Sequence, residues 1–136
     1  MVTAGSLRFF IDRGMGSRYV PEGLRERGWE VVTMNERYGQ QVGEGLEDPD
    51  WIAEATERGE VCLCKDAAIA RKPVEAAAVR SAGARVFAIT NANITGPTQL
   101  EWILRNEARI LRRTKKPGPY VHGIYADDVR PLNLRE

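Results

Sequence analysis

The sequence of 136 residues contains only two cysteines and one histidine. A structural zinc site needs four such ligands and a disulfide framework needs several cysteine pairs, so neither class of small domain is expected. Cys62 and Cys64 lie two residues apart in an apolar stretch, which places both side chains on one face of a strand. We therefore expect two buried, reduced thiols, which suit a cytoplasmic protein.

Long apolar segments and a strong net charge are also missing. No apolar run approaches the roughly 20 residues of a membrane-spanning helix. The first five residues lack the basic segment and apolar run of a secretory signal. The 20 basic residues nearly cancel the 19 acidic ones, so net charge indicates no nucleic-acid partner. We expect a cytoplasmic protein without a membrane partner.

What the chain does contain is a regular alternation of strands and helices. Strands are predicted at residues 7–11, 29–33, 60–64, 85–89 and 120–125. Helices are predicted at 18–27 with Ser17 as cap, from 48 up to a closing glycine at 59, at 72–82 and at 98–113. Residues 34–47 predict a long loop, and residues 126–136 a polar tail. This order predicts an α/β fold: a three-layer α/β/α sandwich with a mostly parallel central sheet, in one domain spanning 1–136 with its core at about 7–125.

Three aspartates mark the ends of these elements. Asp12 follows the first strand, Asp66 follows the strand at 60–64, and Asp48 opens the helix that leads into that strand. In open α/β sheets function collects beyond the carboxyl ends of the strands, and a crossover helix begins at that same edge. Converging carboxylates are the hard ligands that Mg²⁺ or Mn²⁺ requires, and such ions stabilise the attacking and leaving oxygens at a phosphodiester.

Each of these acids also has a purely structural interpretation. Asp48 suits the N-cap of its helix, Asp66 could cap the helix that follows it, and Asp12 could serve a turn. Capping does not prevent metal binding, so both interpretations stay open.

The stretch from Asp48-Pro49-Asp50-Trp51-Ile52 to Cys64-Lys65-Asp66, together with Phe9-Phe10-Ile11-Asp12, resembles the PIN domain. This is the compact ribonuclease fold of VapC-type toxins in toxin–antitoxin pairs. PIN domains begin with a strand that ends in Asp, and later have an Asp that opens a helix, a glycine, a strand and another Asp. The opening Asp12-Arg13-Gly14 and the junction at 24–32 are closer to the shortened PIN-like branch. The resemblance covers about residues 7–90.

The resemblance implies a metal-dependent endoribonuclease that is a toxin. Its catalytic and metal-binding residues would be Asp12, Asp48 and Asp66, its cofactor Mg²⁺ (or Mn²⁺), and its partners an RNA substrate and a cognate antitoxin that occludes the acidic groove. Relatives carry a fourth acid, for which Glu36, Glu44, Glu47 and Asp50 are the candidates, while Ala68 stands where many relatives have one more acid. A non-catalytic PIN-like protein- or RNA-interaction module is the alternative, and a phosphatase a weaker one.

Basic residues suggest where RNA would bind. Arg13 and Lys65 each adjoin a proposed ligand, where they could orient a phosphate or only screen the carboxylates. Arg109 and Arg112 lie in a basic run on the predicted helix 98–113 and are expected to contact the RNA backbone, the alternative being a solvated helix end. His122, the single histidine, is a weak candidate for a general base. Exposed apolar helix faces could support a homodimer.

Overall fold

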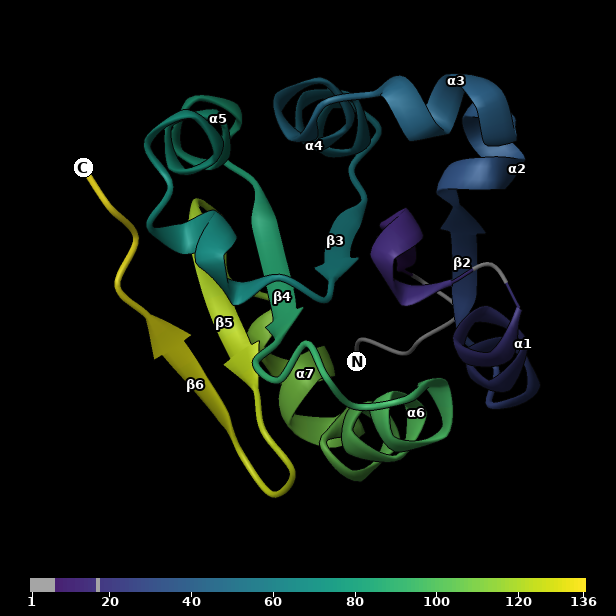
Figure 1. Ribbon diagram of the computed structural model, residues 1–136. Coiled ribbons are helices and arrows are strands. Elements are labelled where there is room, and N and C mark those ends of the chain that lie inside the picture. Colours follow the sequence, from purple (N-terminus) through teal and green to yellow (C-terminus); the bar gives the residue numbers. More distant parts are fainter. Residues whose placement is uncertain (1–6, 17) are drawn as a thin grey trace.

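The computed structural model describes residues 7–16 and 18–136, so the capping role predicted for Ser17 lies outside the described residues. One sheet in the order β2-β1-β3-β4-β5-β6 crosses the molecule (Figure 1). Its strands are β1 (Arg8–Ile11), β2 (Glu30–Thr33), β3 (Val61–Cys64), β4 (Arg85–Ile89), β5 (Tyr120–Ile124) and β6 (Val129–Leu132). β1 to β5 run parallel and β6 pairs antiparallel with β5, which confirms the mostly parallel sheet.

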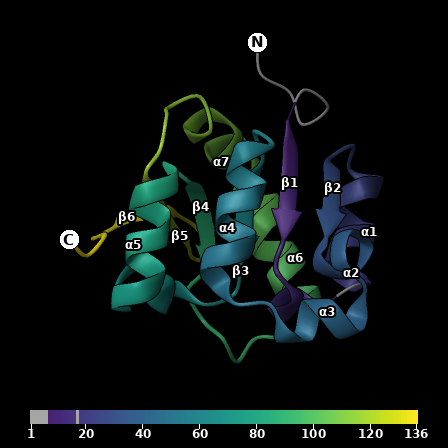
Figure 2. The same ribbon diagram turned by 90° about the horizontal axis from the view of Figure 1, so that it is seen from above.

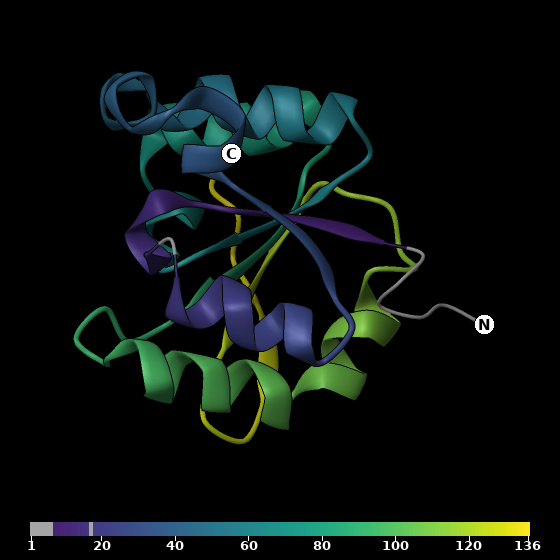
Figure 3. The same ribbon diagram turned by 90° about the vertical axis from the view of Figure 1, so that its right-hand side faces the viewer.

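Helices cover both faces of this sheet, as Figures 1 and 3 show. One layer holds α2 (Met34–Tyr38), α3 (Gln40–Gly45), α4 (Asp48–Glu57) and α5 (Pro73–Ala82). The other holds α1 (Tyr19–Glu26), α6 (Gly96–Arg105) and α7 (Glu107–Arg113). The three-layer α/β/α architecture is therefore confirmed. Within the described part of the chain, no helix has the length and apolar character needed to cross a membrane.

Alternate residues of β1 face opposite layers, because successive side chains of a strand point to opposite sides. Phe9 and Ile11 pack in the core beneath α1 and α6, whereas Phe10 packs with Cys62 and Cys64 in the core beneath α4 and α5. Both thiols are buried and unpaired, as expected. Asp12 continues β1 with extended backbone, which puts its side chain on the Phe10 face.

The long loop predicted at 34–47 is wrong, since this segment forms α2 and α3. A capping box starts α2: Thr33 Oγ1 accepts from the Glu36 N–H at 3.1 Å, and Glu36 Oε1 accepts from the Thr33 N–H at 2.9 Å. Thr-Met-Asn-Glu carries the sequence signature of this motif, and satisfying two amides in this way starts a helix despite the weak apolar period.

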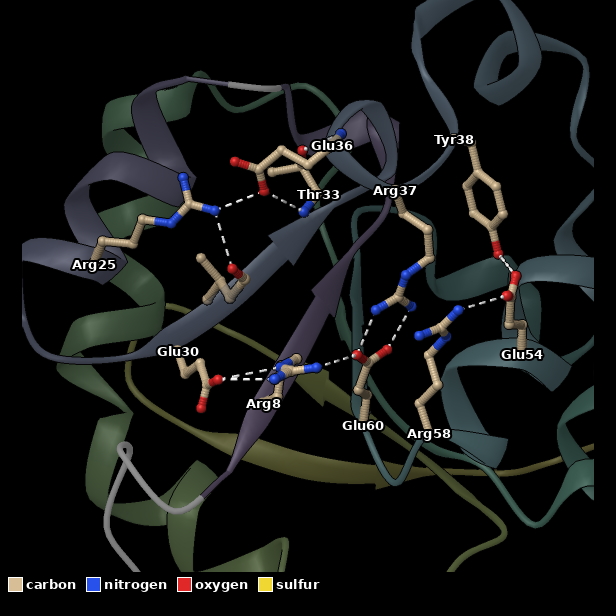
Figure 4. A network of polar contacts seen from close by, with 11 residues as sticks. Arg8, Arg25, Glu30, Thr33, Glu36, Arg37, Tyr38, Glu54, Arg58 and Glu60 are labelled. Atoms are coloured by element: carbon tan, nitrogen blue, oxygen red, sulfur yellow. Dashed lines mark hydrogen bonds and ion pairs between the residues drawn. The ribbon is translucent and has the colours of Figure 1, made fainter.

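A buried ion pair holds α2 against the sheet (Figure 4). Arg37 donates hydrogen bonds of 2.6 and 2.5 Å to the two carboxylate oxygens of Glu60, a residue only 1% exposed. The same guanidinium lies 5.0 Å from the centre of the Phe10 ring. Tyr38 also donates to Glu54 on α4. These contacts anchor the segment that connects β2 to the start of α4.

Two further predictions near the carboxyl end differ from the structure. The helix predicted at 98–113 is broken at Asn106, whose side-chain amide donates to Trp102 O at 2.9 Å and to Tyr125 O at 2.8 Å. An asparagine that bonds main-chain carbonyls competes with helix continuation, which explains the break. The polar tail predicted at 126–136 contains β6, because Val129 is buried and the strand pairs with β5. Its Pro131 is tolerated at the edge of the sheet.

Candidate metal and catalytic site

Asp12 and Asp48, together called the acidic pair below, lie close enough to repel each other. The main-chain N–H of Asp12 donates to Leu63 O at 3.0 Å, which fixes the end of β1 beside β3. Burial raises the pKa of Asp12 from 3.8 to about 6, and the Asp48 carboxylate is the second cause of the increase. The main-chain amides of Arg13 and Gly14 act in the opposite direction. The sheet therefore brings two of the three predicted acids together.

Trp51 positions Asp48 in this pair. Asp48 is the first residue of α4 and Glu47 is its N-cap, so the N-cap role predicted for Asp48 is wrong. Instead, Asp48 Oδ1 accepts a hydrogen bond of 2.9 Å from Trp51 Nε1. The indole stacks on Phe10 with ring centres 5.5 Å apart. Since Phe10 and Asp12 share one face of β1, this contact directs Asp48 toward Asp12. Sequence reasoning missed the role of Trp51, although its spacing of three residues from Asp48 puts both on one helix face.

Asp66, the third predicted acid, has other partners. Its Oδ1 accepts from the Ala68 N–H at 2.9 Å and so caps the short 3₁₀ helix η3 (Ala67–Ala70), as the structural interpretation predicts. Its Oδ2 lies 3.5 Å from Lys72 Nζ. Across residues 7–16 and 18–136, no three His, Cys, Asp or Glu side chains form a group that could hold a metal ion in these conformations. The part of Asp66 as a ligand stays a prediction.

The acidic pair nonetheless fits a divalent cation. Carboxylates are hard oxygen donors of the kind that Mg²⁺ and Mn²⁺ prefer. Desolvation and mutual repulsion hold the pKa of Asp12 up, and a cation between the two carboxylates would relieve both penalties. Arg13 does not neutralise the pair by direct contact, because its Nη1 donates to Gly43 O at 2.6 Å and so ties the turn η2 (Arg13–Met15) to α3.

Lys65 flanks the acidic pair. A Cβ atom added to Gly14 would lie 3.3 Å from Asp12 Oδ2 and 3.9 Å from Lys65 Cβ, so these two side chains border the same glycine. A lysine here can meet a phosphate that approaches the carboxylates.

Comparison with known proteins shows the family of the chain. Residues 7–91 match the family described as "PIN like domain". The chain belongs to this family. It is also 33% identical over 120 residues to a Mycobacterium tuberculosis (strain ATCC 25618 / H37Rv) protein named "Putative ribonuclease VapC45", covering 88% of this chain and 87% of that protein. No solved structure matches the chain.

The fourth acid of this PIN-like domain stays a prediction, but its candidates differ in surroundings. Glu36 is held by the capping box and by Arg25, whose Nη2 lies 2.6 Å from its carboxylate and lowers the pKa of Glu36. Glu47 occupies the N-cap position of α4 without a side-chain capping bond, and Asp50 is exposed in the first turn of that helix. Glu44 lines a cavity of about 210 Å³ that Arg13 also lines. Glu44 is thus the candidate that shares a cavity with Arg13, the residue that follows Asp12 in the sequence.

The predicted RNA-contacting residues of α7 lie away from the acidic pair. Figures 2 and 3 show α7 at the end of the PIN-like domain opposite to the turn that follows β1. Arg109 donates to Asn106 Oδ1 at 3.1 Å, and Arg112 lines a cavity of about 420 Å³ with Arg113 and His122. Arg113 donates to His122 Nδ1 at 2.8 Å. Burial, with Arg113 and Lys116, lowers the pKa of His122 to about 4, so this ring is neutral and remote from the acids.

Proposed function

We propose that this PIN-like domain is a metal-dependent endoribonuclease and the toxin of a toxin–antitoxin pair. Membership of the family supports the proposal, as does the similarity to a protein named as a ribonuclease. The observation that carries it is the acidic pair: a partly buried Asp12 whose pKa is raised to about 6 by burial and by Asp48. Two repelling carboxylates at the carboxyl edge of a parallel sheet are poised for a divalent cation.

The residues of this chain then have distinct tasks. Asp12 and Asp48 would hold Mg²⁺ (or Mn²⁺), and Asp66, whose carboxylate accepts from the Ala68 N–H in this structure, would be the third ligand. When bound, the ion supplies positive charge to the phosphodiester and lowers the pKa of water. Trp51 keeps Asp48 aligned through its indole N–H. Lys65 meets the incoming phosphate and reduces its repulsion by the acids.

The partners follow from the same proposal. Arg109 and Arg112 contact the RNA backbone at a distance from the cleaved bond, and Arg13 does so beside it. A cognate antitoxin covers the acidic pair, and two copies of the chain form a homodimer through exposed helix faces. A toxin that cleaves cellular RNA acts in the cytoplasm.

The test is cleavage of a fluorescently labelled single-stranded RNA by the full chain. We expect Mg²⁺- or Mn²⁺-dependent endonucleolytic products that disappear with EDTA. Asp12→Asn and Asp48→Asn each remove a ligand and should reduce the rate by at least about 100-fold, on the scale of losing an essential catalytic group. Glu57→Gln, which changes an exposed acid at the other end of α4, is the matched control and should cleave at the wild-type rate. Cleavage that persists in EDTA would contradict the proposal.

A further inference from the structure

A groove of about 500 Å³ begins at Gly14, the residue that borders both Asp12 and Lys65. α1 contributes Tyr19 to its lining, and α6 contributes Gly96 and Gln99. Lys65 and Arg18 also line it. The groove lies on the α1 and α6 side of the sheet, whereas Asp48 comes from α4 on the opposite side. A nucleic-acid strand that extends from the acidic pair across Gly14 would enter this groove directly.

The groove is electropositive. α1 begins at Tyr19 and α6 at Gly96, so two helix amino termini border the same space. Such termini present unbonded amides and a partial positive charge that favour phosphate. Lys65 and Arg18 add two full charges, and neither is in an ion pair with any other described residue.

Tyr19 provides an aromatic surface at the same place. This residue is 56% exposed, which is unusual for an aromatic residue in this chain. A Cβ added to Gly96 would lie 3.4 Å from Tyr19 Cβ, so the tyrosine packs directly on the start of α6. Nearby, Gly23 packs so tightly on Leu100 that a Cβ would come within 2.3 Å of it. α1 and α6 therefore form a close-packed support that holds the ring at the groove.

Gln99 adds an unsatisfied polar group to the wall. The residue is only 4% exposed, and its Nε2 donates to Ile94 O at 3.1 Å. Its Oε1 is the buried side-chain atom without a hydrogen-bond partner among the described residues. An unpaired buried carbonyl costs about 1–3 kcal/mol, so this wall lacks a donor such as a hydroxyl or amino group.

We propose that this groove binds a nucleotide of single-stranded RNA next to the cleaved phosphodiester. Lys65 and the amino termini of α1 and α6 bind the phosphate, the Tyr19 ring stacks on the base, and a ligand hydroxyl or amino group serves Gln99. Stacking on an aromatic side chain tolerates any base, so the groove holds the strand rather than selecting a sequence. The inference rests on the proposed ribonuclease function, because RNA is the strand that would reach the groove.

The experiment measures binding separately from cleavage. Affinity for a short fluorescein-labelled single-stranded RNA is measured by fluorescence anisotropy with EDTA present, so that no strand is cut. Tyr19→Leu removes the π face and should weaken binding about tenfold, whereas Tyr19→Phe keeps the face and should retain the affinity. Lys65→Gln should weaken binding and reduce the slope of log affinity against log salt by about 0.7, the value for one phosphate contact on a single strand.

Arg58→Gln is the matched control for the loss of one positive charge in Lys65→Gln. Arg58→Gln removes one exposed charge at the far end of α4, where Arg58 pairs with Glu54, and should leave affinity unchanged. Wild-type affinity and salt slope in both Tyr19→Leu and Lys65→Gln would overturn the groove proposal, even if the chain cleaves RNA. The groove proposal is also overturned if these two variants keep their RNA affinity and lose only the binding of an antitoxin. Weakened RNA binding in a chain that never cleaves would uphold the groove and reject the nuclease.

Discussion

The indole Nε1 of Trp51 donates a hydrogen bond of 2.9 Å to Asp48 Oδ1, while its ring stacks on Phe10 of the neighbouring strand. A core aromatic residue thus holds a proposed metal ligand. Trp29 makes a comparable pair of contacts on the other face of the sheet: it packs on Phe9 and donates to Glu107 at 2.7 Å. The chain therefore contains its own control for the role of Trp51.

Trp51→Phe should raise the Mg²⁺ concentration required for half-maximal cleavage by about tenfold, because a hydrogen bond to a charged group contributes about 1.5–3 kcal/mol and part of this aligns the ligand. Trp29→Phe removes an equivalent bond and should lower stability similarly without changing the Mg²⁺ requirement. The measurement is a Mg²⁺ titration of cleavage with thermal unfolding alongside. Equal Mg²⁺ requirements in the two variants would show that Trp51 has only a structural role.

Asp12 should make the metal-free protein less stable as pH rises. Its folded pKa of about 6 lies above the ordinary value near 3.8, so its contribution is complete below pH 4 and is lost as pH rises through 6. In EDTA, Asp12→Asn should therefore unfold like wild type near pH 4 and be more stable by about 2 kcal/mol at pH 7.5. Urea unfolding at the two pH values provides the comparison. A variant less stable than wild type at pH 7.5 would mean that the ionised carboxylate is well satisfied.

Glu60 should be essential for stability but not for metal binding. Glu60→Gln leaves the guanidinium of Arg37 buried without its counter-charge, and breaking such a pair costs about 3–5 kcal/mol. Arg58→Gln, at the more exposed pair of Arg58 with Glu54, should cost less than about 1 kcal/mol by loss of that ion pair. Urea unfolding gives both values, and Mn²⁺ affinity of the folded fraction should not change. A small loss in Glu60→Gln would mean that α2 is held by other contacts.

His122 should stay neutral through the physiological pH range. Burial and two neighbouring cations lower its pKa to about 4, so the neutral form is favoured in the folded state. Its contribution to stability is present above pH 6.5 and is lost as pH falls toward 4. NMR signals of the ring should therefore show no titration between pH 5.5 and 8. A midpoint near 6.5 would indicate that the ring is not held as the structure describes.

The features of the fold and of the site that could be predicted from the sequence are those that depend on local patterns or on the general geometry of parallel sheets. Asp12 and Asp48 were predictable because strand ends and crossover helices meet at one edge of a parallel sheet. The start of α2 was also predictable from the Thr33–Glu36 capping box, which the weak apolar period obscured.

Other features depend on contacts between distant residues. Arg37 meets Glu60, and Asn106 meets Tyr125, only after the sheet has formed. No local pattern predicts such pairs. The position of Tyr19 over Gly96 likewise depends on the packing of α1 against α6. The sequence also leaves open whether the Asp66 carboxylate caps η3 or serves as a metal ligand.

Calorimetric titration of Mn²⁺ into the full chain tests most directly whether Asp12 and Asp48 together bind a divalent cation. We expect saturable binding by the wild-type protein and by Glu57→Gln, which keeps the pair and loses an exposed acid at the other end of α4. Asp12→Asn and Asp48→Asn should each lose that binding while remaining folded. Wild-type Mn²⁺ affinity in either of these two variants would show that the acidic pair is not the cation site.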